Sequence, residues 1–159
     1  MEKTQKCLAV IRIRGTIDLR GEINDTLKML NLNHNCNSTL IDDRPSYLGM
    51  LQKAQSYISW GEPTVETVTL LLTKRGRTLG NKKLSDEYAK QLGYENLEKL
   101  AEALHSGKVE LKNLKDLKPV FRLHPPKKGY KKTVKRSYQA GGESGRRGEA
   151  INELIKRMI

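Results

Sequence analysis

The stretch Cys7-Leu-Ala-Val-Ile-Arg-Ile-Arg14 decides the fold, because it is a short run of mostly apolar residues whose charges appear only at its far end. That composition is typical of a β-strand that leaves a hydrophobic core. A turn follows at residues 15–21, and Ile23, Leu27 and Leu30 then fall four and three positions apart, on one face of a helix. The start of the chain therefore predicts a strand followed by an amphipathic helix.

A second strand and helix follow in the same order. Residues 38–42 are a brief strand candidate, Asp43 can cap the next helix, and Pro45 stands where a first-turn proline costs no hydrogen bond. One face of that helix is shared by Tyr47, Met50, Leu51 and Ala54. Residues 57–60 then supply a third strand. Residues 1–60 therefore predict a β-α-β-α-β module, a three-stranded sheet with two helices on one side.

The rest of the chain, residues 61–159, predicts a second and mainly helical module. Residues 120–123 are a further strand candidate within it. Helices are expected from apolar spacing and from start and stop signals at residues 65–72, 85–93, 96–107 and 149–158. The two modules together predict an α+β fold.

The charge of the chain is strongly positive and unevenly distributed. The 159 residues carry a formal net charge of +12. Residues 1–60 and 61–118 contribute only +2 each, whereas residues 119–159, with eleven basic and three acidic side chains, contribute +8. Such a field attracts polyanions and releases their counterions, so nucleic acid is the first partner to expect.

The segment of about residues 122–148 is the strongest chemical feature. Lys and Arg side chains neutralise phosphates, while glycines and prolines let the backbone approach an irregular polyanion closely. Residues 124–132 have too few apolar groups to offset their ordering entropy, so this stretch is expected by itself to be extended and mobile, within a loop anchored at both ends. Tyr130 and Tyr138 could stack on unpaired bases or cover the protein's own core. The alternative for the whole segment is a loop that only aids solubility.

The candidate RNA-binding residues fall into three groups. In the basic segment they are Arg122, His124, Lys127, Lys128, Lys131, Lys132, Lys135, Arg136, Arg146 and Arg147. A second contact is expected at Arg14, Arg20, Arg44 and Lys53, and a third basic loop contains Lys74, Arg75 and Arg77.

Catalytic and metal sites are not expected. The glycine-rich residues 141–148 lack the Gly-Lys-Ser/Thr ending of a nucleotide-binding loop. Asp42 and Asp43 would point to opposite faces of a strand, which argues against an acid and base pair. The histidines show no recognisable metal-ligand spacing, and Cys7 and Cys36 are expected to be two buried thiols. No cofactor is expected.

The sequence also argues against a membrane protein and against a common RNA-binding fold. It contains no long apolar run, and Met1-Glu2-Lys3 does not open onto a signal peptide, so a cytoplasmic location is expected. An RNA-recognition motif needs aromatic residues on its central strands, and residues 7–14 offer none. Binding is therefore expected to depend on RNA shape and phosphates.

Several short motifs, in order, carry a family resemblance. They are Arg14-Gly15, Asp25-Thr26-Leu27, Met29-Leu30-Asn31, Ser38-Thr39-Leu40, Gly49-Met50, Gly61-Glu62-Pro63 and Arg122-Leu123-His124-Pro125-Pro126. Residues 7–60 resemble the large-subunit ribosomal protein L-thirty family, and the continuation is similar to its long archaeal form, whose eukaryotic counterpart is called L-seven. The basic N-terminal extension of eukaryotic members is absent, which favours an archaeal source.

This resemblance implies a non-catalytic protein of the large ribosomal subunit, with a first module of ferredoxin-like character. Its expected partners are large-subunit ribosomal RNA and neighbouring ribosomal proteins, without membrane or small-molecule substrate. Free-standing RNA-binding proteins, including RNA chaperones, are the alternative class, and they would bind RNA without stable ribosome association. A nucleotide enzyme or a protein-interaction module has no supporting motif.

Overall fold

The first strand lies at the centre of the molecule. The computed structural model describes residues 5–159, so Met1-Glu2-Lys3, considered above, lies outside the described residues. Strand β1 (Cys7–Arg12) alternates between two cores: Leu8 and Val10 face one, and Ala9 and Ile11 face the other. Because both faces of this strand are covered, it is an almost continuous apolar run and not an alternating one.

The β-α-β-α-β order is confirmed, but the sheet has five strands where three were expected. Strands β2 (Asn37–Asp42) and β3 (Ile58–Gly61) pair antiparallel with β1 on its two sides. Two short strands from the second module, β4 (Phe121–Arg122) and β5 (Gly145–Arg146), extend the edges in the order β4-β2-β1-β3-β5. β4 is antiparallel to β2, and β5 is parallel to β3.

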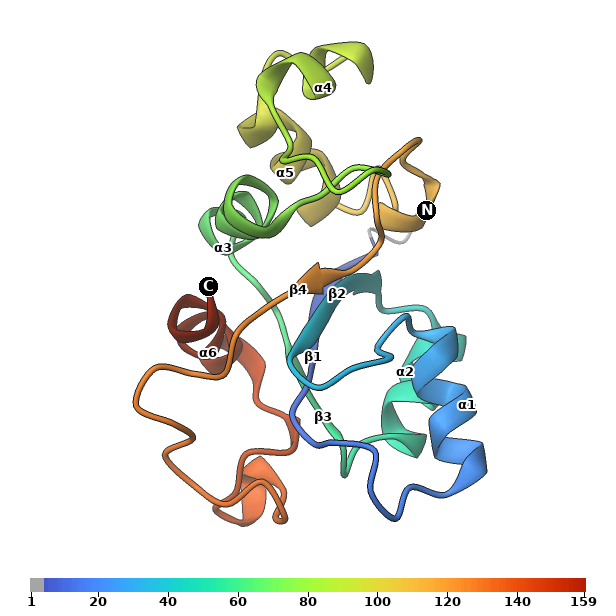
Figure 1. Ribbon diagram of the computed structural model, residues 1–159, viewed down its shortest axis with the longest axis vertical. Coiled ribbons are helices and arrows are strands. Elements are labelled where there is room, and N and C mark those ends of the chain that lie inside the picture. Colours follow the sequence, from blue (N-terminus) through green and yellow to red (C-terminus); the bar gives the residue numbers. More distant parts are fainter. Residues whose placement is uncertain (1–4) are drawn as a thin grey trace.

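Two helices cover one face of the sheet, as predicted. Helices α1 (Gly21–Met29) and α2 (Pro45–Lys53) lie side by side on the same side of the strands (Figure 1). Pro45 begins α2, but the residue at the cap position is Arg44, and no side chain caps the helix. The expected cap at Asp43 is therefore wrong; this carboxylate accepts a hydrogen bond from the Lys6 backbone N–H at 3.2 Å.

The helices of the second module pack against the opposite face or extend beyond the sheet (Figure 1). Helix α3 (Val65–Leu70) continues into a π-helical turn at Leu71–Arg75. The remaining helices are α4 (Asp86–Gln91), α5 (Leu97–His105) and α6 (Ile151–Met158), and short 3-10 turns lie at Leu111–Asn113, Tyr138–Ala140 and Gly148–Ala150.

The two cysteines are free and buried, as predicted. Burial, with a smaller contribution from nearby Asp42, raises the pKa of the Cys7 thiol to about 12. Cys36 lies in the same core, against the face covered by the second module. Both thiols are therefore packing groups in the structure.

Arg12 corrects the expectation that the charges of the first strand point out of the core. Its side chain is 0% exposed. The guanidinium donates to the carbonyl oxygens of Leu32 at 2.8 Å, Arg14 at 2.9 Å and Gly15 at 3.3 Å. It therefore ties the end of β1 to the loops on either side of α1.

The basic segment is folded against its own backbone and α6, which corrects the expectation of an extended loop. The backbone N–H groups of His124 and Lys127 donate to carbonyls at the end of α6, at 3.1 and 3.0 Å. Farther along, the Glu143 N–H donates to the Thr133 carbonyl at 3.0 Å. These hydrogen bonds and the buried polar groups described below hold a segment whose apolar content is low.

Candidate nucleic-acid interface

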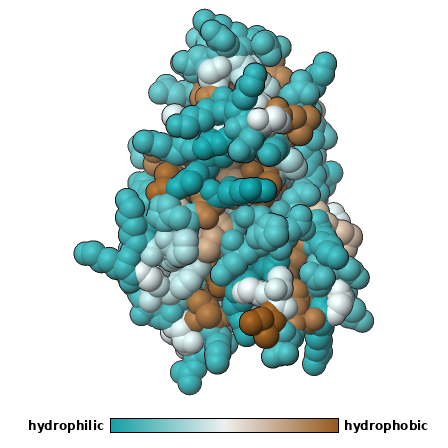
Figure 2. Space-filling model, viewed as in Figure 1, coloured by the Kyte–Doolittle hydropathy of each residue, from teal (hydrophilic) through white to brown (hydrophobic). Residues whose placement is uncertain are grey.

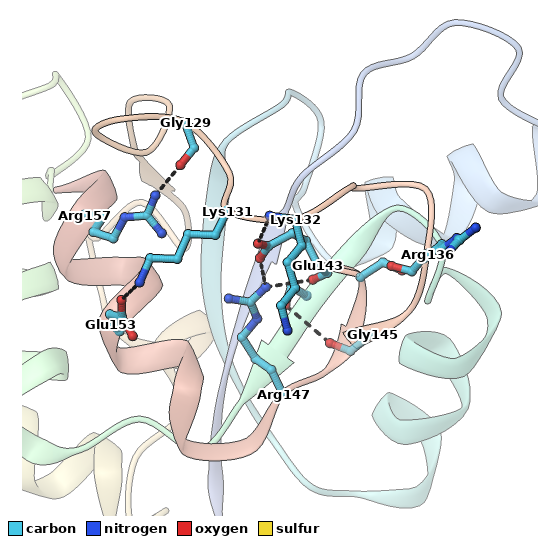
Figure 3. Close-up of polar contacts among 11 residues, drawn as sticks. Gly129, Lys131, Lys132, Arg136, Glu143, Gly145, Arg147, Glu153 and Arg157 are labelled. Carbon is cyan, nitrogen blue, oxygen red and sulfur yellow. Dashed lines mark hydrogen bonds and ion pairs between the residues drawn. The ribbon is translucent and has the colours of Figure 1, made fainter. Parts of the chain in front are cut away.

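Lys127 and Lys128 project from a tight turn that α6 holds in place. Lys128 and Gly129 both have positive φ, 64° and 72°, and the Gly129 N–H donates to the Pro126 carbonyl at 2.9 Å. The Arg157 guanidinium donates to the Lys127 carbonyl at 3.2 Å and also to the Gly129 carbonyl (Figure 3). The turn is thus fixed through its backbone, which leaves both lysine side chains exposed to solvent.

Lys131 and Lys132 have partners within the protein. The Lys131 ammonium lies 2.5 Å from the Glu153 carboxylate of α6, and this contact lowers the pKa of Glu153. Because both side chains are more than 60% exposed, the ion pair is weak enough for phosphate to replace it. The Lys132 ammonium lies 5.4 Å from the centre of the Tyr138 ring, a cation–π contact at the surface.

Glu143 and Arg147 form a buried ion pair at the centre of the basic segment (Figure 3). Each side chain is only 6% exposed. The Arg147 guanidinium also donates to the Glu143 carbonyl at 2.9 Å, and the Lys132 backbone N–H donates to the Glu143 carboxylate at 2.9 Å. The Arg147 side chain therefore faces inward and organises the loop, and the phosphate contact predicted for it stays a prediction.

The other cations of the basic segment differ in whether they have partners within the protein. Lys135 and Arg136 are exposed and have no ion pair among residues 5–159, and Arg136 points away from the buried pair (Figure 3). Arg146 pairs with Glu62 at 3.0 Å but remains 64% exposed. The His124 ring contacts the carbonyl oxygens of Pro125 and Ile159 at 2.6 and 2.8 Å, so it mainly holds the chain.

The two tyrosines of the segment serve the protein's own packing. Tyr130 is half-buried against the larger core, and burial raises the pKa of its hydroxyl above the ordinary range. Tyr138 is covered by Lys132 and by the Arg147 guanidinium, which lies 5.0 Å from the ring centre. Of the two uses considered for these rings, covering the protein is the one that the contacts support.

Gly142 allows the close approach on which this loop depends. A Cβ added there would lie 2.0 Å from the Arg136 carbonyl oxygen, which is backbone and cannot move freely. That carbonyl accepts hydrogen bonds from the Ser144 N–H at 3.1 Å and its hydroxyl at 2.9 Å. The glycine therefore lets two strands of the loop pass within hydrogen-bonding distance.

The variant Gly142→Ala is expected to destabilise the loop by about 2 kcal/mol, the usual size of an overpacking strain. Hydrogen exchange at the Ser144 amide should speed up accordingly. Gly49→Ala is the matched control, because nothing lies within 4 Å of the added Cβ in helix α2 and alanine favours helices. Equal protection of Ser144 in both variants would contradict this role for Gly142.

The residues predicted to make the second contact lie on three elements. Arg14 and Arg20 lie in the loop before α1, Arg44 lies in the loop before α2, and Lys53 lies on helix α2. Arg20 is exposed at the start of α1, and Arg14 stacks over the Tyr57 ring at 4.8 Å. Lys53 lies 3.8 Å from Glu22 of α1, in an exposed pair. The residues thus surround one end of the α1 and α2 layer but do not converge on one point.

Arg44, predicted to contact RNA, already has two carboxylate partners within the protein. Its guanidinium lies 2.8 Å from the Asp42 carboxylate and 2.7 Å from the Glu110 carboxylate, and the hydrogen bond to Asp42 is the main cause of a raised pKa. Glu110 belongs to the second module, 66 positions away. Arg44 therefore joins the two modules, and its charge is already balanced.

The third predicted group lies at the far end of the π-helical turn. Arg75 and Arg77 line a hollow together with Arg122 of β4, while Lys74 is exposed nearby. The same hollow is lined by Lys118, which sequence reasoning missed because it follows a helical stripe of leucines and belongs to no charge run. The fold therefore brings together cations from two segments that are about forty positions apart in sequence.

Among residues 5–159, no group of three or more His, Cys, Asp or Glu side chains could hold a metal ion. In the same residues, no helix is both long and apolar enough to cross a membrane.

Comparison with known proteins first defines the class. The family model described as ribosomal protein L30p/L7e matches residues 8–58, which cover the strands and helices from β1 to the start of β3. Over these residues the chain is similar to the class of ribosomal proteins that the model describes. The match confirms the predicted resemblance for the first module.

Longer relatives then define the family. A large ribosomal subunit protein uL30 from Archaeoglobus fulgidus is 51% identical over 151 residues, covering 94% of this chain and 98% of the relative. Proteins of the same name from Staphylothermus marinus and Methanobrevibacter smithii are 49% and 48% identical, covering 95% and 94% of this chain. The chain therefore belongs to the L30p/L7e family. The similarity to archaeal members and the expectation of a non-enzyme are confirmed.

Proposed function

We propose that this chain is a structural constituent of the large ribosomal subunit that binds and stabilises folded ribosomal RNA. Relatives named as large ribosomal subunit proteins match this chain over nearly their whole length. In this proposal residues 1–60 form a core module of ferredoxin-like character. Residues 61–159 form an extension whose basic loop, about residues 122–148, contacts RNA.

The observation that carries the RNA contact is the rigid presentation of free cations. Lys127, Lys128, Lys135 and Arg136 are exposed and form no ion pair among the described residues, while the backbone beneath them is tied to α6 and to itself. Repulsion between like charges works against such clustering in the free protein. A polyanion removes that repulsion, and a prearranged backbone reduces the ordering entropy that binding must overcome.

The face of the molecule drawn in Figure 2 is mostly hydrophilic, and large apolar side chains are scattered over it. Figure 2 shows one face that is mainly hydrophilic, with hydrophobic residues in separate small areas. Among residues 5–159, the most exposed large apolar residues are Ile17, Leu79, Met29 and Leu48. This supports contacts made mainly through phosphates, with neighbouring ribosomal proteins as secondary partners.

Binding of the purified chain to deproteinised large-subunit RNA, measured over a range of salt concentrations, tests the proposal. The logarithm of the binding constant should fall steeply and linearly with the logarithm of salt, by about 0.7 to 0.9 per phosphate contact. A chain that binds equally well at low and high salt would contradict a phosphate interface. Equal affinity for an unrelated RNA of the same length would instead favour a free-standing RNA chaperone.

A further inference from the structure

A basic hollow lies at the β4 edge of the sheet, where the basic loop begins at Arg122. It is lined by Arg75, Arg77, Asn81, Lys118, Val120 and Arg122. Four of these six residues are cations and none is a carboxylate. Among residues 5–159, none of the four cations takes part in an ion pair. The cluster therefore has unbalanced charge.

Backbone contacts hold these cations together. The Arg77 guanidinium donates to the Gly76 carbonyl at 2.9 Å and to the Lys74 carbonyl at 3.3 Å. The Lys118 N–H donates to the Arg77 carbonyl at 3.0 Å, which joins two segments about forty positions apart in sequence. The four like charges are thus held near one another by the fold, although their mutual repulsion opposes that arrangement.

An exposed leucine, Leu79, lies between Arg77 and Lys83, which form an isolated antiparallel bridge. Leu79 is 63% exposed, and its N–H donates to the Asp116 carbonyl at 2.8 Å. The next two residues, Gly80 and Asn81, have positive φ of 94° and 65°, so they form a tight turn that presents the leucine outward. An apolar side chain beside a group of cations suits a ribose or base next to a bound phosphate.

The hollow is separated from the other edge of the sheet. Arg122 lies on β4 and Arg146 on β5, at opposite ends of the order β4-β2-β1-β3-β5. Four strand spacings of about 4.8 Å place these edges roughly 19 Å apart. One phosphate cannot contact both edges, so the hollow would need its own anion.

We propose that the hollow at the β4 edge binds a phosphate of the RNA backbone, and that Leu79 contacts the nucleotide beside it. This inference rests on the proposed function and adds to it a contact that joins Arg122, at the start of the basic loop, to residues outside that loop. The arginines supply planar groups that match phosphate geometry, and Lys118 and Asn81 supply further donors.

The test uses the full chain, deproteinised large-subunit RNA and the double variant Arg75→Gln/Arg122→Gln. The slope of binding against salt should fall by about one, as expected for one lost phosphate contact. The variant Arg75→Lys/Arg122→Lys keeps the charge and should restore most of the slope. A slope unchanged by the glutamine variant would overturn the inference. The proposed function would still stand if the wild-type chain binds with strong salt dependence.

Two further variants distinguish the effect of this site on RNA binding from the effect of net charge. Lys90→Gln/Lys99→Gln removes the same charge from exposed positions on α4 and α5, and it should leave the slope unchanged. An equal fall in this control would show a general charge effect and overturn the inference. Leu79→Ser should weaken binding by roughly threefold to tenfold without changing the slope, since it removes apolar contact only. Unchanged affinity would overturn the nucleotide contact.

Discussion

Replacing Arg12 by methionine is expected to lower the free energy of unfolding by about 3 kcal/mol, because the change leaves buried carbonyl oxygens without donors. Methionine can fill much of the same space but donates no hydrogen bond. The carbonyls of Leu32, Arg14 and Gly15 would lose the guanidinium that now satisfies them. Burial of the cation lowers the pKa of Arg12, yet arginine stays protonated at any physiological pH, so the interaction persists.

Urea unfolding followed by circular dichroism measures this effect. Arg12→Lys keeps the charge but cannot reach three carbonyls at once, so its stability should fall between those of the wild type and Arg12→Met. Arg14→Met is the neighbouring control: Arg14 stacks on Tyr57 at the surface, and its loss should cost less than about 1 kcal/mol. If Arg12→Met were as stable as the wild type, the guanidinium could not be what fastens the two loops.

Removing four free cations from the basic loop should have the largest effect on RNA binding. The variant carries glutamine at Lys127, Lys128, Lys135 and Arg136, which are exposed and unpaired among residues 5–159. The salt slope should fall by about three to four, and affinity at about 0.15 M salt should fall roughly 100-fold. Thermal stability should change little, because these side chains form no ion pair among residues 5–159 and lie outside the core.

Filter binding of the variant to deproteinised large-subunit RNA gives both quantities. The control Lys90→Gln/Lys99→Gln removes two charges where the variant removes four, so twice its loss shows how much follows from net charge alone. Lys131→Gln adds an informative comparison, because Lys131 already pairs with Glu153 and should contribute less than a free lysine. If the dependence of the binding constant on salt is unchanged after loss of all four cations, this loop is not part of the RNA interface.

The first sixty residues could be predicted well because their order is local. The apolar spacing that identified α1 and α2 recurs within one helix, and each strand between them is long enough to show its composition. Strands β4 and β5 are two residues each and gain their partners from far along the chain. The periodicity of apolar residues does not indicate which strands pair when they are far apart in sequence. A sheet of only three strands was therefore expected.

The site could be predicted only as a set of residue types. Composition indicates that Lys and Arg gather near the C-terminus, but it cannot tell which of them the fold turns inward. Arg147 pairs with Glu143 four positions away, and Arg44 pairs with Glu110 across the two modules. Arg75 and Arg77 join Lys118 and Arg122 only because the π-helical turn and β4 meet. Such arrangements depend on tertiary packing, which no single segment encodes.

Sedimentation of a gently lysed native extract through a sucrose gradient after a high-salt wash, with this chain followed by mass spectrometry, tests the structural role in the large subunit most directly. The proposed function predicts stoichiometric recovery of the chain with the large subunit. Release to the top of the gradient would contradict it and favour a free RNA-binding protein.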